Sequence, residues 1–536
     1  MIYKISFFVA TILFSFGLNA QTAPFNVELE SITIPNLGGV QAYSFGQHNG
    51  KWLIVGGRLD GLHQRQPFAA FDVAGHNNQL LVIDPESKQK WSAPLTSLPT
   101  GIQEQLSSTN MEFFQEGDYL YCVGGYGYSA TENDHTTYPN LTAIKVSDVI
   151  NAVVNNTSFT GFFRQITDTK FQVTGGKLKK IGDTYYLLGG QKFLGRYNPM
   201  GPTHGPGFIQ EYTEAIRVFN LNDDGTNLSV THLPSYSDAT NLHRRDYNAE
   251  AQIMPNGKEG ITMFSGVFQT SVDLPFLNSV DVDSSGYQVN NNFQQYYNHY
   301  HCAAVPLYSS TENEMHTLFF GGIAQYYDSS GVLVQDNNVP FVNTIARVTR
   351  DASGNMAEYK LPKEMPELLG AGSEFIVNQN IDMYSNEVLK LDELNEERNF
   401  IGYIYGGISS TAANIFFTNT GSQSSASSQI FKVYLTNYAT GNHDLNEQSI
   451  GSLDMRVYPN PSKKDFTVKF ELDKEDDVSV IITDISGRMI ENIVLKNQPQ
   501  GENSFQKRVR SFDKSGVYFI TIQSSTETAT QKIIIE

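Results

Sequence analysis

Six copies of one short pattern limit what this chain can fold into. In each copy, a run of apolar residues ends in two small residues. The copies are WLIVGG, LYCVGG, YYLLGG, ITMFSG, LFFGG and GYIYGG, and their last glycines are separated by 68, 65, 76, 56 and 85 residues. Such recurrence is typical of arrays in which each unit buries its apolar face against the next unit. We therefore expect one all-β array over residues 21–437.

Each repeat is expected to contain four antiparallel strands, a to d, with the pair of small residues closing strand b. A polar turn precedes strand b, as at residues 47–50 (QHNG), and a long loop after it leads into a second hairpin. Glycine and asparagine accept the positive φ angles of tight hairpin turns. The paired glycines would let a neighbouring backbone approach strand b where the units crowd together.

The repeat resembles that of kelch-type β-propellers. The best match is residues 51–99, which carry the glycine pair, then Trp91, and end in Leu-Pro. The resemblance implies a six-bladed propeller. The last unit stops after strand c, so we expect Asn26–Pro35 to supply its outer strand and close the ring. Another all-β repeat, or two β-sandwiches, is the alternative.

The N-terminus predicts export. Residues 1–20 (MIYKISFFVATILFSFGLNA) place Lys4 before an apolar run and a small residue, Ala20, before the expected cleavage point, as in a secretory signal peptide. The apolar run is shorter than the roughly 20 residues that span a bilayer. No later segment reaches that length without polar breaks, so we expect no transmembrane segment.

The composition favours a folded, acidic protein. Hydrophobic residues make up 40%, aromatic residues 12% and charged residues only 17%, which argues against disorder. The 37 basic and 56 acidic residues give a net charge of −19, so nucleic acid is not an expected partner because its phosphates would be repelled. Two cysteines exclude a disulfide scaffold and a cysteine-rich zinc cluster.

A polar stretch at 438–452 is expected to be a linker, and residues 453–536 a small β-sandwich of about seven strands with alternating apolar residues. This tail resembles the C-terminal sorting domain of proteins exported by the type IX secretion system of Bacteroidetes. The resemblance covers nearly all of 453–536. The matching positions are Tyr458, Pro459, Asn460, Pro461, Gly487, Arg488, Gly516 and Tyr518.

The resemblance of the tail implies passage through the periplasm, recognition by the type IX secretion machinery and cleavage by a surface sortase. The chain would then be secreted or displayed on the outer membrane. An adhesive immunoglobulin-like module is the alternative interpretation of the tail.

The long b–c loops are the expected location of a ligand site. They span 58–78, 126–140, 191–212, 267–277, 323–341 and 408–428, and loops of such length are usually functional or disordered. They carry the candidate residues Arg58, Tyr126 and Arg196. Aromatic faces beside hydrogen-bonding groups suit a sugar ring, and arginine suits a carboxylate.

Two segments that lead into inner strands are denser in polar and aromatic residues. One supplies the candidates Arg245, Asp246, Tyr247 and Asn248, and the other supplies His299 and His301. Both are expected at the mouth of the central channel, in neighbouring blades four and five. Charged residues at such positions are costly unless they are paired or used, so we expect the ligand site at this corner, although an Arg245–Asp246 pair could be purely structural.

These features predict an exported or surface-displayed propeller that binds a glycan or a protein partner, with no catalytic residue assigned. The alternative is a carbohydrate-active enzyme on the same face, similar to sialic-acid mutarotases, in which Glu112, Arg245 and Asp246 would perform acid–base chemistry. A copper radical oxidase resembling galactose oxidase is a further alternative, supported only by Tyr300-His301 and by His299 and His301 on one strand face, whereas Cys122 is expected to be a buried, inert thiol.

No cofactor and no metal site are expected. The segment that begins at Asp281 starts like a calcium-binding loop but has Asn292 at the twelfth position instead of glutamate. It also coincides with the hairpin between strands c and d of its repeat, so the repeat explains it as a turn.

Overall fold

In the computed structural model, the described residues are 24–66, 68–200, 207–329, 332–394, 396–437, 455–463, 465–472, 474–484, 489–508, 515–524 and 528–535. The chain forms two compact units. The first comprises Phe25–Asp328 and Leu333–Asn437, and the second contains Tyr438–Glu536. The expected signal peptide, the expected linker, and Gly487 and Arg488 of the sorting motif lie outside the described residues.

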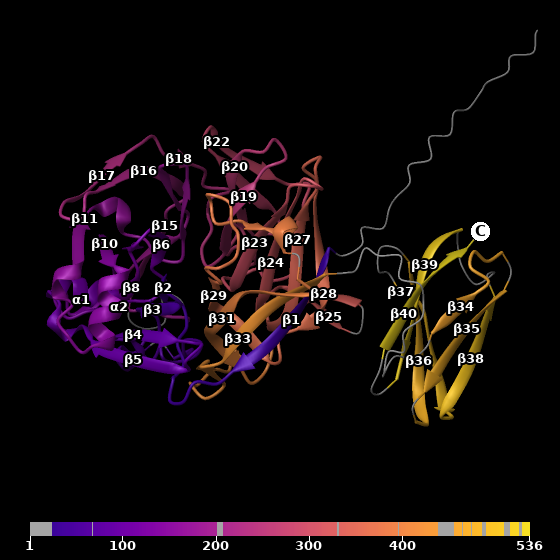
Figure 1. The fold of residues 1–536 in the computed structure, drawn as a ribbon. Coiled ribbons are helices and arrows are strands. Elements are labelled where there is room, and N and C mark those ends of the chain that lie inside the picture. Colours follow the sequence, from indigo (N-terminus) through magenta and orange to yellow (C-terminus); the bar gives the residue numbers. More distant parts are fainter. Residues whose placement is uncertain are drawn as a thin grey trace, which may run out of the picture. The chain divides into compact units, whose positions relative to one another are not determined.

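The first unit is a β-propeller of six four-stranded antiparallel blades (Figure 1). From the channel outward, blade one contains β2 (Ser44–His48), β3 (Lys51–Val55), β4 (Gln79–Asp84) and β5 (Gln89–Pro94). Blade two contains β6 (Glu112–Glu116), β7 (Tyr119–Val123), β10 (Asn140–Lys145) and β11 (Phe163–Thr167). Blade three contains β12 (Lys177–Ile181), β13 (Thr184–Leu188), β16 (Ala215–Asp223) and β17 (Leu228–His232). A short strand, β18 (Tyr236–Ser237), also pairs with β16.

Blade four contains β19 (Asn248–Ile253), β20 (Glu259–Phe264), β21 (Ser279–Asp283) and β22 (Gly286–Asn290). Blade five contains β23 (Ala303–Ser309), β24 (Glu314–Ile323), β27 (Phe341–Arg350) and β28 (Met356–Glu364). Blade six contains β29 (Leu368–Val377), β31 (Arg398–Ser410), β33 (Ile430–Asn437) and the N-terminal β1 (Phe25–Ile32). Each b strand is rich in apolar residues because both of its faces are buried between neighbouring strands and blades.

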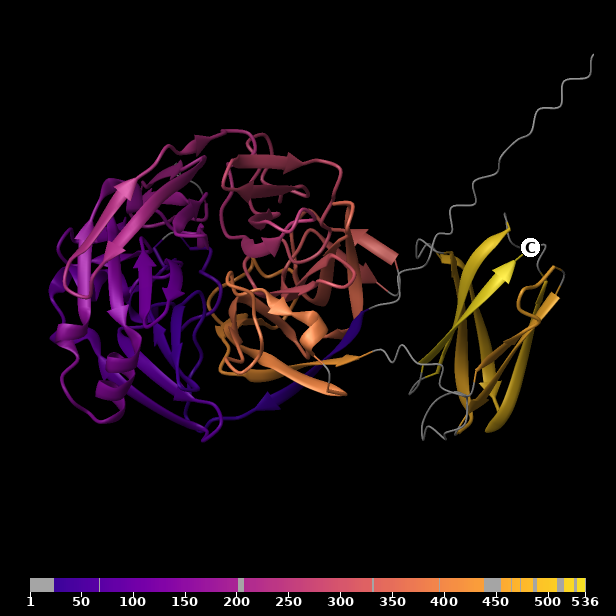
Figure 2. The ribbon, with the colours of Figure 1, turned by 45° about the horizontal axis from the view of Figure 1, so that its top comes forward.

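The N-terminal strand completes the sixth blade. β1 pairs antiparallel with β33 over eight residues, from Phe25 opposite Asn437 to Ile32 opposite Ile430. In Figures 1 and 2, β1 (indigo) lies beside the orange strands of the sixth blade. The pairing satisfies the outer edge of β33, which would otherwise present open hydrogen-bonding groups.

A closed ring of six backbone hydrogen bonds surrounds the channel. Five of the donors lie two positions before an inner strand, and the sixth, Gly372, lies within β29. Each donates its N–H to the carbonyl of the equivalent residue in the preceding blade. The bonds are Ala42 to Gly372 (2.8 Å), Gly372 to His301 (2.9 Å), His301 to Asp246 (2.9 Å), Asp246 to Gly175 (2.7 Å), Gly175 to Asn110 (3.3 Å) and Asn110 to Ala42 (3.1 Å). All but His301 have a positive φ angle, which explains the glycine, asparagine and aspartate at these positions.

The glycine pairs have the role that the sequence suggested. At the first glycine of a pair, an added Cβ would meet a carbonyl oxygen of the next blade: 1.9 Å from Leu369 O at Gly321, and 2.0 Å from Val173 O at Gly124. The second glycine then donates its N–H across the same boundary, as Gly57 does to Ser108 (2.9 Å). Side chains at the first position would therefore push adjacent blades apart.

Several b–c loops contain regular structure of their own. Those of blades two and three form hairpins, β8 (Tyr126–Ser129) with β9 (Asp134–Thr137) and β14 (Gln191–Leu194) with β15 (Ile209–Tyr212), which join in one four-stranded sheet. Blade five adds β25 (Tyr326–Ser329) with β26 (Val332–Gln335), and in blade six β32 (Ser424–Ala426) pairs with β31. The loop face is therefore held by backbone pairing.

Two helices lie outside the strands, α1 (Thr100–Leu106) and α2 (Val146–Val154). Their apolar residues join the core between the first two blades, where Ile102, Val149 and Val153 are buried. In the described ranges no helix has the length and apolar character needed to cross a membrane.

The second unit is a β-sandwich. One sheet contains β34 (Arg456–Tyr458), β35 (Asp465–Leu472) and β38 (Gly501–Arg508), and the other contains β37 (Met489–Gln498), β36 (Asp476–Asp484), β39 (Gly516–Gln523) and β40 (Thr528–Ile535). Alternate residues such as Val468, Val480 and Ile520 fill the core. This matches the expected alternation of apolar and polar residues.

The contact between blades can be tested with two glycine substitutions. Both Gly50 and Gly321 have a positive φ, but a Cβ at Gly50 meets nothing within 4 Å. Gly50→Ala should therefore cost only the backbone strain of about 1–2 kcal/mol. Gly321→Ala should cost at least about 3 kcal/mol, because the clash with Leu369 O is added.

The measurement is guanidinium unfolding followed by tryptophan fluorescence. Both tryptophans of the chain, Trp52 and Trp91, lie in the first blade, so the signal reports on the propeller. Equal losses of stability for the two variants would contradict the assigned role of the glycine pairs.

Candidate functional site

Two cavities follow the central channel, and the ring of hydrogen bonds separates them. The upper chamber, about 720 Å³, receives residues from all six b–c loops. The lower chamber, about 760 Å³, is lined mainly by the inner strands of the blades. Ala42, Asn110, Asp246 and His301 line both chambers, and we call this level of the channel the waist.

An ion pair occupies one side of the waist. The Arg245 guanidinium donates to the Asp246 carboxylate and, through Nε, to the Tyr212 hydroxyl (3.1 Å). Burial lowers the pKa of Arg245, but the adjacent Asp246 outweighs burial, so the net shift is upward. The Asp246 side chain fits because residue 175 is glycine, whose added Cβ would lie 2.7 Å from Asp246 Oδ1.

Aromatic rings and side-chain amides line the upper chamber. The aromatic residues are Phe71, Tyr126, Phe193, Tyr197, Phe208, Tyr212, Phe268, Tyr300, Phe341, Phe416 and Phe417, and the amide residues are Gln41, Asn110, Gln191, Asn198, Gln210, Gln269, Asn337, Asn338 and Asn414. His63 joins the aromatic cluster, with its ring 5.1 Å from that of Tyr197. Burial lowers the pKa of His63 to about 4, so its ring is neutral near pH 7.

The b–c loops also carry the exposed apolar side chains of the propeller. In the described part of the first unit, eight large hydrophobic residues are strongly exposed: Leu59, Phe68, Val73, Met200, Ile209, Val272, Leu333 and Phe417. All of them lie between a b strand and the following c strand. Phe68 and Phe417 are 71% and 55% exposed. We call this set the apolar rim.

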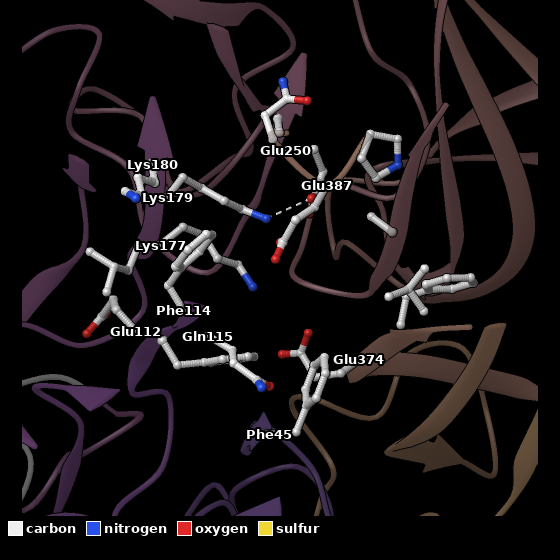
Figure 3. Close-up of a pocket in the computed structure, with 18 of the residues that line it drawn as sticks. Phe45, Glu112, Phe114, Gln115, Lys177, Lys179, Lys180, Glu250, Glu374 and Glu387 are labelled. Atoms are coloured by element: carbon white, nitrogen blue, oxygen red, sulfur yellow. Dashed lines mark hydrogen bonds and ion pairs between the residues drawn. The ribbon is translucent and has the colours of Figure 1, made fainter. Parts of the chain in front are cut away.

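Several charged side chains line the lower chamber (Figure 3). Lys179 pairs with Glu250 (2.8 Å), and His301 pairs with Glu374 (2.7 Å). Burial raises the pKa of Glu374, but His301, Lys177 and Lys179 outweigh this, and the net shift is downward. Glu374 is therefore a carboxylate near pH 7.

Glu112 also lines the lower chamber, but it is 1% exposed. Its Oε1 accepts from Gly176 N (2.7 Å), whereas its buried Oε2 has no hydrogen-bond partner in the ranges that the structure describes. Burial raises the pKa of Glu112 to about 8, so this carboxyl is largely protonated at neutral pH.

The other predicted residues divide between the chamber walls and the scaffold. The Arg58 guanidinium is 2% exposed and is held by Asp60 at 2.5 and 2.7 Å, although it borders the upper chamber. The Tyr126 hydroxyl donates to Gly195 O (2.8 Å) and accepts from Tyr197 N (2.9 Å), so only its ring faces the chamber. Arg196 lines neither chamber and binds Ala70 O (2.7 Å).

Three predicted residues, His299, Asn248 and Tyr247, are buried. His299 is fully buried, with its ring nitrogens bonded to Gln295 O (2.8 Å) and Gln325 N (3.0 Å). Asn248 bridges blades four and five through Tyr300 O (3.1 Å) and Cys302 N (3.2 Å).

Tyr247 is buried at the edge of the lower chamber, and among the described residues its hydroxyl has no hydrogen-bond partner. The expected corner therefore contributes Arg245, Asp246 and His301 to the waist.

The residues of the alternative enzymatic hypotheses do not share one chamber. Arg245 borders only the upper chamber and Glu112 only the lower, with Asp246 between them. Cys122 lines neither chamber, and burial raises the pKa of its thiol to about 12. In the described ranges, no three or more histidine, cysteine, aspartate or glutamate side chains are grouped so that they could hold a metal ion.

Sequence reasoning missed most of the lower chamber, including Lys177, Lys179, Glu374 and Glu387. One signal was present: the connection from strand a to strand b in blade six, residues 378–397, is 20 residues long, whereas the other five have two to five. It belongs to the largest repeat interval in the sequence, 85 residues.

The sorting residues that the structure describes belong to the sandwich. Asn460 links the start of the unit to its last strand, because its amide donates to Lys532 O (2.6 Å) and accepts from Ile534 N (2.8 Å). Tyr458 is 44% exposed in β34, with Pro459 and Pro461 in the turn after it. Gly516 begins β39, and Tyr518 packs into the core.

Comparison with known families explains the tail. Residues 456–536 match the family described as "Secretion system C-terminal sorting domain", which supports a type IX sorting domain and export of the chain to the surface or the medium. No curated protein matches the chain.

Solved structures resemble the chain only distantly. "Structure of YjhT" has a TM-score of 0.38 and 10% identity over 74% of this chain and 98% of that chain. A chain from the RAG complex with one melted and one unmelted RSS has a TM-score of 0.36 and 12% identity over 76% and 99%. A glycoside hydrolase family 43 arabinoxylan arabinofuranohydrolase from Bacillus subtilis has a TM-score of 0.29 and 9% identity over 93% and 94%.

The ionisation of Glu112 makes stability depend on pH. Between about pH 4.5, its ordinary pKa, and about pH 8, the unfolded carboxyl ionises while the folded one keeps its proton. Its contribution to stability is therefore fully present below about pH 4.5 and is lost as the pH rises through about 8. Glu112→Gln should flatten this decline.

The test measures guanidinium midpoints at about pH 5 and about pH 8, with Glu132→Gln as a surface control. An unchanged decline in the Glu112→Gln protein would show that the carboxyl ionises normally.

Proposed function

We propose that this chain is an exported propeller that binds a carbohydrate in the upper chamber. The observation that carries the proposal is the coincidence of three features on the b–c loops: aromatic walls, a lining rich in amides, and the apolar rim. Pockets with aromatic walls and a few placed polar groups are typical of small-molecule sites.

A sugar matches both kinds of lining. Its hydroxyls both donate and accept hydrogen bonds, as do the amides of residues such as Gln210 and Asn337. Its apolar C–H faces pack against aromatic rings, for which Tyr212 and Phe268 lie beside the waist. The Arg245–Asp246 pair offers donors and acceptors with little net charge, which favours hydroxyl groups over a free anion.

The rim extends this surface beyond the chamber. Eight exposed apolar side chains support an interaction face on these loops, because all eight lie on the same segment of the repeat, between strands b and c. Phe417 both lines the chamber and is 55% exposed, so it connects the two regions. A chain of several sugar units would contact the chamber and the rim together.

The two ends of the chain would direct its export. In our proposal, residues 1–20 direct the chain to the periplasm, and the sorting domain then engages the type IX machinery and a surface sortase. The carbohydrate ligand would accordingly be extracellular.

Glycan binding can be measured with the mature full chain on a glycan array and then by calorimetry. Phe417→Ala should weaken binding about tenfold, because it removes one exposed stacking ring. Tyr458→Ala, which removes an exposed aromatic ring of the second unit, is the matched control and should bind normally. An array without binding, or affinity unaffected by Phe417→Ala, would refute the proposal and favour a protein partner.

The export role can be tested in the producing cells. A chain that ends before residue 456 should remain in the periplasm, whereas the full chain should reach the cell surface or the medium. Cell fractionation with an antibody against the propeller separates the outcomes. Surface delivery of the shortened chain would show that residues 456–536 are dispensable for export.

A further inference from the structure

The lower chamber differs chemically from the upper one. Its lining combines lysines and glutamates, and its apolar residues include Phe45, Phe114 and Phe375. It opens on the side of the a–b hairpins, where Gln47, Glu116 and Asp183 contribute to the lining. The carbohydrate proposal makes no use of these groups.

One ammonium group in this chamber is not paired. Lys179 and Lys180 each have a carboxylate partner, Glu250 and Glu116. The Lys177 ammonium, in contrast, makes no hydrogen bond in the described ranges, and no carboxylate oxygen there lies within 4.0 Å of it. The positive charge of Lys177 makes a lowering contribution to the pKa values of Glu112 and Glu374. Figure 3 shows the Lys177 side chain directed into the chamber.

A carboxylate is also left without a hydrogen bond. Glu387 lies in the 20-residue a–b connection of blade six and lines the chamber. In the part of the chain that the structure describes, no donor contacts its carboxyl group, while Glu250 and Glu374 nearby have the partners Lys179 and His301. Burial raises the pKa of Glu387, an effect that Lys179 opposes and Glu250 reinforces. Figure 3 shows Glu387 and Glu374 around the same central space as Lys177.

The connection holds Glu387 firmly in this position. Asn386 donates to Gln252 O (3.1 Å), Ser385 donates to Glu259 (2.6 Å), and Val388 is fully buried. Glu387 itself has a φ of 67°, in the left-handed region where glycine or asparagine is usual. A glutamate at this turn therefore has an unfavourable backbone conformation. Such strain is typical of functional sites, and a role for the Glu387 side chain in the chamber would account for it.

The pattern of charges selects the ligand class. A simple anion would meet Lys177 but also Glu374 and Glu387, and a simple cation would meet the carboxylates but also Lys177 and Lys179. A molecule with one carboxylate and one ammonium can satisfy Lys177 and Glu387 together. The nearby phenylalanine rings would accommodate an apolar group between or beside the two charges.

We propose that the lower chamber binds a zwitterion of the amino-acid class, a free α-amino acid or a short peptide with an apolar side chain. Lys177 donates to the ligand carboxylate, and Glu387 accepts from the ligand ammonium. This site is separate from the carbohydrate site, because the ring of backbone hydrogen bonds lies between them.

Calorimetry on the mature full chain tests the proposal with leucine, phenylalanine and dileucine as probes. N-acetyl-leucine removes the ammonium and leucinamide removes the carboxylate, so each should bind about tenfold more weakly than leucine or not at all. Lys177→Met and Glu387→Gln should each weaken leucine binding by a similar factor. Lys88→Met removes the same charge as Lys177→Met at an exposed site and should bind leucine normally.

Pairing variants with blocked ligands makes the assignment specific. Lys177→Met should cost little further affinity for leucinamide, and Glu387→Gln should cost little for N-acetyl-leucine, because each variant and its blocked ligand remove the same contact. Matching thermal transitions in all variants confirm that each protein is folded. Absence of binding by any zwitterion, or equal losses for free and blocked ligands, would overturn the proposal whatever the glycan array shows.

Discussion

The ring of six backbone hydrogen bonds at the waist is the constraint on which the rest of the propeller depends. Each bond joins equivalent positions of adjacent blades, from Ala42 round to Gly372 and back. It holds five residues at positive φ and brings six inner strands to a common level. The same ring lies between the two chambers, because four of its residues line both of them.

The two chambers differ because different parts of the repeat line them. Loops line the upper chamber, and loops tolerate aromatic and amide side chains without disturbing strand pairing. Inner strands line the lower chamber, where side chains such as Lys179 and Glu250 project from neighbouring blades at fixed separation and can pair across the boundary. The waist residues Asp246 and His301 belong to both chambers. A single scaffold thus offers an aromatic, weakly charged site and a strongly charged one.

Sequence patterns predicted the scaffold better than the sites. The six apolar runs and their glycine pairs report local requirements, a buried strand and a close backbone approach, and these are visible in short segments. Arg245, Asp246 and His301 were found because charged residues before an inner strand are unusual. Asn248 and His299 were predicted from the same two segments and Arg58 from a long loop, and in the structure the side chains of all three bond to neighbouring loops and strands. A side chain's residue type does not reveal whether its partner is the protein or a ligand.

The sequence by itself determined the all-β class, the number of repeats, the sorting domain and the face that carries the long loops. These features rest on periodicity, turn residues and motifs, which act over a few residues. Only the tertiary structure decided which polar groups share a cavity. Lys177 and Glu387 are 210 positions apart in the chain, and they line one chamber because the ring closes and a long connection folds back over it. Closure of the ring is a cooperative, long-range event, and no local pattern encodes the contacts that it creates.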